Sequence, residues 1–147
     1  MRTMQSLRWL PFTLLALVAN PIQGPSARAL WLYVTSNAND RVLRYDGVTG
    51  AFISEFVSPG SGGLSGPLGL TFGPDGNLYV ASADGGTNFI NRYSRASGAF
   101  LSTFATGGGM SQPFDVVFGP DSTGDFFPDL YVSSFDTSAV LRFTGAT

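Results

Sequence analysis

The sequence predicts an all-β protein, a partial β-propeller of about two and a half four-stranded antiparallel blades. Four short phrases recur in a fixed order, with 46 to 52 residues between successive copies. Each phrase is rich in Val, Leu, Ile, Phe and Tyr and is bounded by Gly, Pro, Asp, Asn or Ser, which is the pattern of a strand between turns. No window keeps a period of 3.6 residues, so no helix is expected after residue 29.

The phrases give the strands of each blade, lettered a to d from the inside outward. Strand a is P-x-[GD]-[LV]-x-F-G-P-D, which begins at Pro67 and Pro113. Strand b is L-Y-V-x-S, which begins at Leu32, Leu78 and Leu130. Strand c is [VI]-x-R-[YF], which begins at Val42, Ile90 and Val140. Strand d is [ST]-G-A-F-[IL]-S-x-F, which begins at Thr49 and Ser97.

The order of the phrases divides residues 30–147 into three blades. Strands b, c and d form a partial blade at 31–57, all four strands form a full blade at 67–104, and strands a, b and c form a partial blade at 113–147. Both faces of these strands carry apolar or aromatic side chains, as expected of a blade that packs between two neighbours. Aromatic residues that recur at the blade period predict the core between blades: Tyr33, Tyr79, Tyr131, Phe72 and Phe118.

The segment "GPLGLTFGPDGNLYVAS" at Gly66–Ser82 resembles the NHL-type propeller repeat over nearly its whole length. The resemblance extends over Leu30–Thr147, and exported bacterial proteins with "LRYDG-TGAF" repeats look similar. Two features depart from the NHL pattern: only Asp40–Arg41 approximates its Asn-Arg pair, and the third repeat inserts "STGDFF". Streptogramin-lyase and gluconolactonase-type propellers are more distantly similar. The former rely on a histidine that this sequence lacks, and the Glu, Asn and Asp metal ligands of the latter have no matching set in this chain.

Residues 1–29 have the features of a secretory signal peptide. Two arginines precede the apolar run Trp9–Ala19, and small residues precede the cleavage site expected after Ala29. A membrane anchor is the alternative, but this run of eleven residues is too short for a bilayer core that needs about 20. We therefore expect a secreted or periplasmic protein with no membrane span after cleavage.

The composition of residues 30–147 restricts the possible functions. Five arginines and ten acidic residues give a net charge near −5, which argues against nucleic acid as a partner. The sequence contains no cysteine, histidine or lysine. Without these residues there is no Ser-His or Cys-His pair, no N/S zinc site and no Schiff-base lysine. The sequence therefore predicts no catalytic, cofactor-binding or metal-binding residue.

The number of blades leaves three explanations open. Propellers close with about four to eight blades, and terminal repeats normally carry polar caps that neither end of this sequence shows. The sequence favours a fragment of a longer propeller. Head-to-tail self-assembly of several copies is less favoured, because ten strands do not divide evenly into four-stranded blades, and a short open stack is the third explanation.

Several residue groups have both a functional and a structural interpretation. Asp121, Asp125 and Asp129 in the 121–129 loop could bind calcium, but their spacing is not that of a calcium hand and a solvated turn is favoured. Asp75 is assigned to turn chemistry, and the single glutamate, Glu55, to protection of an edge strand. A ring of arginines could bind anions, although duplication and packing explain the repetition equally well: Arg44, Arg92 and Arg142.

Two glycine-rich stretches, Pro59–Gly66 and Gly107–Ser111, are interpreted as flexible connectors between blades rather than phosphate loops. In a propeller the d–a and b–c connectors share one face, where binding loops are expected. These connectors are Ser36–Asp40, Ser58–Gly66, Ala83–Asn88, Ala105–Gln112 and Phe135–Ser138. They are small, polar and mildly acidic. The sequence thus predicts a non-catalytic scaffold or recognition module for a protein or glycan, with part of a propeller hydrolase or lyase as the alternative.

Overall fold

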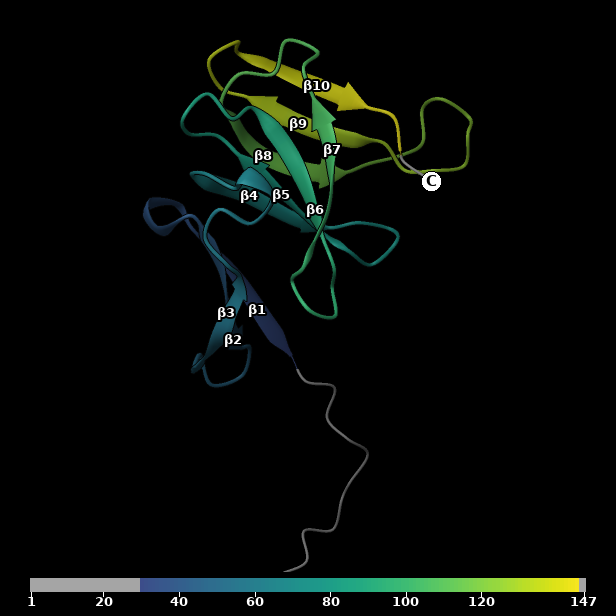
Figure 1. Cartoon of the computed structure of the whole chain (residues 1–147). Helices are drawn as coiled ribbons and strands as arrows, with labels where there is room; N and C mark the ends of the chain where they lie inside the picture. Colours follow the sequence, from purple (N-terminus) through teal and green to yellow (C-terminus); the bar gives the residue numbers. More distant parts are fainter. Residues whose placement is uncertain (1–29, 146–147) are drawn as a thin grey trace, which may run out of the picture.

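The computed structural model describes residues 30–145, which form ten strands (Figure 1). The predicted signal peptide at 1–29 lies outside these residues. The strands are β1 (Trp31–Ser36), β2 (Arg41–Asp46), β3 (Phe52–Val57), β4 (Pro67–Phe72), β5 (Leu78–Ser82), β6 (Phe89–Tyr93), β7 (Phe100–Thr106), β8 (Pro113–Phe118), β9 (Leu130–Ser134) and β10 (Ala139–Phe143). Among these residues no helix is long and apolar enough to cross a membrane.

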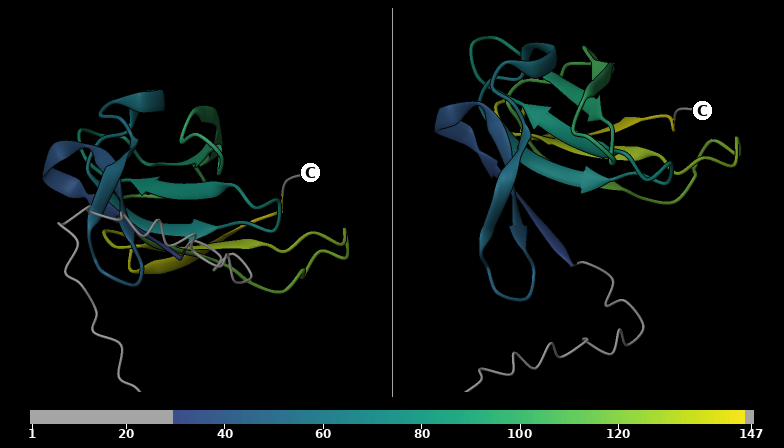
Figure 2. Two further views of the ribbon diagram at one scale, coloured as in Figure 1. Left: turned by 90° about the horizontal axis from the view of Figure 1, so that it is seen from below. Right: turned by 60° about the horizontal axis from the view of Figure 1, so that its bottom comes forward.

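The strands form three antiparallel meanders, which confirms the predicted partial propeller. The first blade has the order β1-β2-β3, the second β4-β5-β6-β7, and the third β8-β9-β10. These blades correspond to the predicted strand series b-c-d, a-b-c-d and a-b-c. The first and third blades lie on opposite sides of the second (Figures 1 and 2).

The hydrophobic core lies between the blades and not within any one of them. The cluster between the first and second blades contains Val42, Leu64 and Leu78, all at most 2% exposed. The cluster between the second and third blades contains Ile90 and Leu130, both fully buried. Because β5 has neighbours on both faces, all five of its residues are buried. Each blade is therefore stabilised mainly by the blades beside it.

Two aromatic clusters repeat at the blade period, as the sequence predicts. In the first, the ring centroid of Tyr33 lies 4.8 Å from that of Phe56 and 5.1 Å from that of Phe72. In the second, the equivalent Tyr79 lies 5.1 Å from Phe104 and 4.9 Å from Phe118. All four contacts are edge-on, the geometry that aromatic pairs prefer.

The third tyrosine of the series differs from this expectation. Tyr131 points to the face of the third blade that is turned away from the second, and its ring lies against Gly119. No strand of residues 30–145 packs on that face, so Tyr131 is only partly buried. The prediction that it belongs to a core between blades is wrong within the described structure, because that core needs a strand d and a following strand a.

Two short 3-10 helices, at Asn37–Asn39 and Ser61–Gly63, correct the expectation that the chain has no helix. Each is one turn within a connector. A single turn of this kind has too few residues to show an amphipathic period, so the sequence pattern did not reveal it.

Candidate functional site: the inner mouth

The connectors between strands d and a and between strands b and c meet on one face, as predicted. The backbone N–H groups of Ala83 and Asp84 donate to the carbonyl of Ser65, at 3.1 and 3.2 Å. In the next repeat, the N–H of Phe135 donates to the carbonyl of Gln112 at 3.1 Å. The five connector loops therefore form a continuous surface along the three blades.

A serine pair ties each d–a connector to the blade that follows it. The Ser82 hydroxyl accepts from the N–H of Ser65 and donates to its carbonyl, both at 2.9 Å. The Ser134 hydroxyl makes the same two hydrogen bonds, also at 2.9 Å, with Ser111. Ser82 and Ser134 are buried, so these hydrogen bonds form away from solvent. The end of each glycine-rich connector next to the inner strand is thus held in place.

A second contact ties the same connector to the blade that precedes it. The Asp40 carboxylate accepts from the N–H of Gly66 at 2.7 Å, and the Asn88 side-chain oxygen accepts from the N–H of Gln112 at 2.8 Å. Asp40 and Asn88 occupy the same repeat position, immediately before strand c. The last two residues of each connector are therefore tied to the following and the preceding blade, which sets the spacing of neighbouring blades.

The inner strands β4 and β8 approach each other closely beneath this surface. A Cβ atom at Gly69 would lie 2.6 Å from the Cα of Asp115 and 2.8 Å from the carbonyl oxygen of Phe114. Only glycine permits this approach without a backbone shift. The equivalent position of β8 is Asp115 itself, which is exposed.

The connectors and inner strands surround a hollow of about 270 Å³, which we call the inner mouth. It is lined by Asn37, Leu68, Asp84, Gln112, Phe114 and Phe135. These residues come from all three blades. A second hollow of about 300 Å³ adjoins it along the inner strands and shares Asn37, Leu68 and Phe114. The lining therefore depends on the packing of the blades and not on a single loop.

The inner mouth combines exposed phenyl rings with carboxylates. Phe114 and Phe135 are 54% and 65% exposed, and their ring centroids lie 6.2 Å apart with a tilt of 33°. Asp84 lines the hollow, Asp115 lies at the adjoining one, and both are exposed. Exposed phenyl rings beside carboxylates suit an apolar group that carries a positive charge.

The arginines at the repeated position of strand c do not form an anion-binding ring. Arg92 lies 3.6 Å from Asp75 in the turn of its own blade, and Arg142 donates to the hydroxyl of Ser122 in its own blade. Arg44 stacks over Trp31, with its guanidinium carbon 4.8 Å from the ring centroid. Each arginine is thus engaged within its own blade, which agrees with the structural interpretation of the repetition.

Asp75 has the predicted turn role and a further one. It accepts from the backbone N–H and the side chain of Asn77 at 2.9 and 2.8 Å, and from the Tyr79 hydroxyl at 3.2 Å. Partial burial works against its ionisation, but these hydrogen bonds and the charge of Arg92 outweigh burial and lower the pKa of Asp75. Asp75 therefore links its turn to the core tyrosine.

The acidic loop at 121–129 does not bring its three carboxylates together. Asp121 accepts from the backbone N–H groups of Thr123, Gly124 and Phe126 at 2.7 to 2.9 Å. Asp125 accepts from the backbone N–H of Phe127 at 3.0 Å. Among residues 30–145 no three acidic, histidine or cysteine residues are grouped so that they could hold a metal ion. Asp121 and Asp125 therefore hold the backbone of their own loop through these hydrogen bonds.

Asp129 is fully buried, so its placement in a solvated turn is wrong. Its carboxylate accepts from the hydroxyl and backbone N–H of Ser122 and from the N–H of Gly145, and lies 3.9 Å from Arg142. The Ser122 hydroxyl is the largest cause of the lowered pKa of Asp129. Asn77 occupies the same repeat position, and its side-chain oxygen accepts from the backbone N–H of Arg95. The position therefore has a structural role in both repeats.

Glu55 lies on β3, an edge strand of the first blade, as expected, and pairs with Arg41 at 2.7 Å. Four of the six residues that line the inner mouth lie in the predicted connectors, whereas Leu68 and Phe114 lie in the inner strands and were not predicted to line it. The serines at 65 and 111 both precede an x-Pro step, and this shared pattern was a usable signal for the serine pairs that hold the connectors. Phe114 had no such signal, because an apolar residue in a strand is read as core.

Comparisons with known proteins support the fold. No family profile matches the chain, and no curated protein matches it. Three solved structures that it resembles are a catalytically inactive, histidine-to-alanine virginiamycin B lyase from Staphylococcus aureus with quinupristin, a streptogramin B lyase, and a luciferin-regenerating enzyme. Their TM-scores are 0.55, 0.54 and 0.56, and their sequence identities are 22%, 21% and 26%.

These alignments include most of this chain and less than half of the other proteins. They cover 78%, 80% and 78% of this chain but 37%, 38% and 41% of the three structures. At this level of identity the likeness establishes a β-propeller-type fold and not an activity.

Proposed function

We propose that this chain is part of an exported, NHL-like β-propeller that recognises a protein partner at the inner mouth without catalysing a reaction. The observation that carries the proposal is the exposed pair Phe114 and Phe135 beside Asp84 and Asp115. Phe135 lies on a connector and Phe114 on the inner strand β8, and exposed aromatic rings held by a rigid scaffold are typical of recognition surfaces.

The chemistry of the inner mouth indicates the partner. Its carboxylates and the net negative charge of residues 30–147 favour a cationic group, and the phenyl rings favour an apolar or aromatic one. A protein segment in which lysine or arginine adjoins an apolar side chain has both properties. A neutral glycan could stack on the rings but would leave the carboxylates with weaker partners.

The second candidate is part of a propeller lyase or hydrolase, which is favoured by the resemblance to virginiamycin B lyase. The variant of that lyase described as catalytically inactive has lost a histidine, and residues 1–147 contain no histidine at all. Such chemistry would need residues outside this sequence. The recognition proposal uses only residues that are present.

The test measures binding of the full chain to arrays of cationic-aromatic peptides and of neutral oligosaccharides. We expect a peptide to bind, and Asp84→Asn and Phe114→Ala each to weaken it about tenfold. The matched controls Asp125→Asn and Phe126→Ala lie in the loop between β8 and β9, on the opposite face, and should bind like the unmodified chain. Equal losses in the controls, or binding of glycans alone, would contradict the proposal.

Export has a separate test. Expression in a bacterium with secretion intact should yield a mature protein whose N-terminus, read by mass spectrometry, is Leu30. A chain that stays in the cytoplasm with residues 1–29 attached would contradict the export part of the proposal and leave the binding part standing.

A further inference from the structure

Each blade has a groove that can receive the connector leading to the following blade. In the first blade this connector groove contains Val42 and Asp40, and it holds Leu64 to Pro67. Val42 is fully buried beneath Leu64, which is itself 2% exposed. Asp40 accepts the N–H of Gly66 at 2.7 Å, and Pro67 then begins β4.

The connector groove of the second blade is filled in the same way. Ile90 occupies the position of Val42 and is fully buried against Met110. Asn88 occupies the position of Asp40 and accepts the N–H of Gln112 at 2.8 Å. Pro113 then begins β8. The two occupants share the sequence pattern Leu or Met, Ser, Gly or Gln, Pro.

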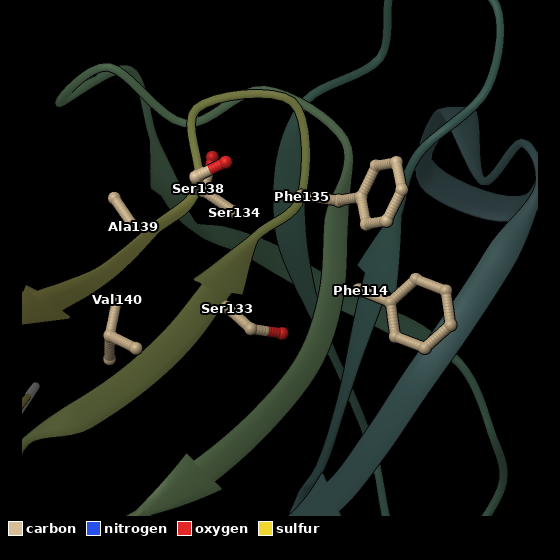
Figure 3. A pocket seen from close by; sticks show the side chains of 7 residues that line it. All are labelled: Phe114, Ser133, Ser134, Phe135, Ser138, Ala139 and Val140. Atoms are coloured by element: carbon tan, nitrogen blue, oxygen red, sulfur yellow. The ribbon is translucent and has the colours of Figure 1, made fainter.

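The equivalent groove of the third blade is open. It is a hollow of about 400 Å³ with Phe114 and Phe135 on one side, Ala139 and Val140 on the other, and serines between them (Figure 3). Val140 occupies the position of Val42 and Ile90, but it is 71% exposed whereas they are fully buried. Residues 30–145 contain no segment that covers it.

The third groove keeps the local geometry of a filled one. Ser138 takes the position of Asp40, and both residues have the left-handed backbone, with φ of 51° and 52°. Asn88, the acceptor of the second groove, does not have this backbone, so the first and third blades share it while the second presents its acceptor without it. The hydroxyl of Ser138 can accept a backbone N–H as the Asp40 carboxylate does.

We propose that the third connector groove binds an extended segment of the pattern Leu or Met, Ser, Gly or Gln, Pro, supplied by a further propeller blade. The large residue covers Val140, the N–H of the third residue reaches Ser138, and proline starts an inner strand beside β8. The strand that follows also supplies a phenyl ring for Tyr131, as Phe72 does for Tyr33.

A folded second copy of this chain is a poorer occupant than a further blade. Each copy has two segments of the required pattern, at 64–67 and 110–113, and both are already bound in its own grooves. A second copy could offer such a segment only by opening its core. The groove shares Phe114 and Phe135 with the inner mouth, so the tests below use Val140, which lines the groove but not the inner mouth.

The first test uses a synthetic peptide with the sequence of residues 63–72 and the full chain, with binding followed by calorimetry. We expect Val140→Asp to weaken binding by roughly tenfold or more, because the peptide would bury the introduced carboxylate beneath the leucine that corresponds to Leu64. Val48→Asp is the matched control, since Val48 is 82% exposed in the turn between β2 and β3. A peptide in which aspartate replaces the residues that correspond to Leu64 and Pro67 should not bind.

The second test attaches the segment covalently and so removes the limit set by the affinity of a short peptide. The residues after Phe143 are replaced by a copy of residues 94–118, which supplies a strand d, a connector and an inner strand. We expect a higher Tm than that of the original chain. Val140→Asp should lower the Tm of the extended chain clearly and leave that of the original chain nearly unchanged.

Three results would overturn the proposal. The first is that Val140→Asp changes neither the affinity for the peptide nor the Tm of the extended chain. The second is that the aspartate-containing peptide binds as tightly as the peptide with the original sequence. The third is self-association of the original chain, seen by light scattering and abolished by Val140→Asp, because it would make a second copy the occupant.

Discussion

Val42 and Val140 occupy the same repeat position but opposite environments, and this pair tests the blade packing quantitatively. Val42 is fully buried between the first and second blades, while Val140 is 71% exposed. Val42→Ala removes two buried methyl groups, worth about 0.8 kcal/mol each. With the cavity left behind, the loss in free energy of unfolding should be about 2–3 kcal/mol. Val140→Ala should cost at most about 0.5 kcal/mol.

The assay is urea unfolding of the full chain and the two variants, followed by far-ultraviolet circular dichroism. The difference between the midpoints, multiplied by a common m-value, gives the free-energy difference. The reasoning is refuted if the two substitutions cost the same, because the first and third blades would then be equally covered or equally open.

Three further predictions concern local features. Gly50 and Gly98 are equivalent and both have φ of +72°, but an added Cβ meets nothing at Gly50, whereas at Gly98 it collides with the backbone carbonyl oxygen of Phe56. Gly50→Ala should therefore cost about 1 kcal/mol and Gly98→Ala about 3 or more in urea unfolding, and equal costs would contradict the packing. The folded pKa of Asp129 lies below its ordinary value of 3.8, so its ionisation adds stability above that pH, which is lost as the pH falls through the folded value. The Tm of Asp129→Asn should therefore fall less steeply than that of the original chain as the pH is lowered below 3.8. An equal slope of Tm against pH would contradict the lowered pKa of Asp129. Burial raises the pKa of Tyr93 from 10.0 to about 12, so the stability it adds below pH 10 is lost as the pH rises towards 12. Burial also raises the pKa of Tyr79, so ultraviolet titration should find late tyrosines of which Tyr93→Phe removes the latest, and persistence of that latest transition in the variant would count against this.

The sequence predicted the blade architecture because the repeat is written into turn and strand chemistry. Segments such as Leu78–Ser82 and Pro67–Phe72 carry strand composition and are followed by residues that force a turn. Repetition makes each short signal stronger than it is alone. The face shared by the connectors followed from the strand order, since antiparallel strands alternate in direction.

The inner mouth could not be predicted in the same way. Phe114 follows Pro113 in a strand phrase, and its equivalent in the earlier repeat is Leu68, so its side chain reads as core. Whether such a residue is buried depends on neighbouring strands and not on its own pattern. The burial of Asp129 was hidden for a similar reason, because the partner Ser122 lies in an insertion that only one repeat contains.

The repeat symmetry also explains why Tyr131 was assigned to a core. The sequence position of Tyr131 is that of Tyr33 and Tyr79, and the pattern carries no information about whether a further blade is beside it. A repeat predicts the shape of a contact surface but not its occupant.

Hydrogen–deuterium exchange of the full chain, resolved by peptide mass spectrometry, tests the central claim most directly. That claim is that three propeller blades stack in order, with the second covered on both faces and the third open on one. The account predicts the slowest exchange in β5 and β6 and markedly faster exchange in β10, whose outer face and edge are uncovered among residues 30–145. Protection of β10 equal to that of β6 would contradict it.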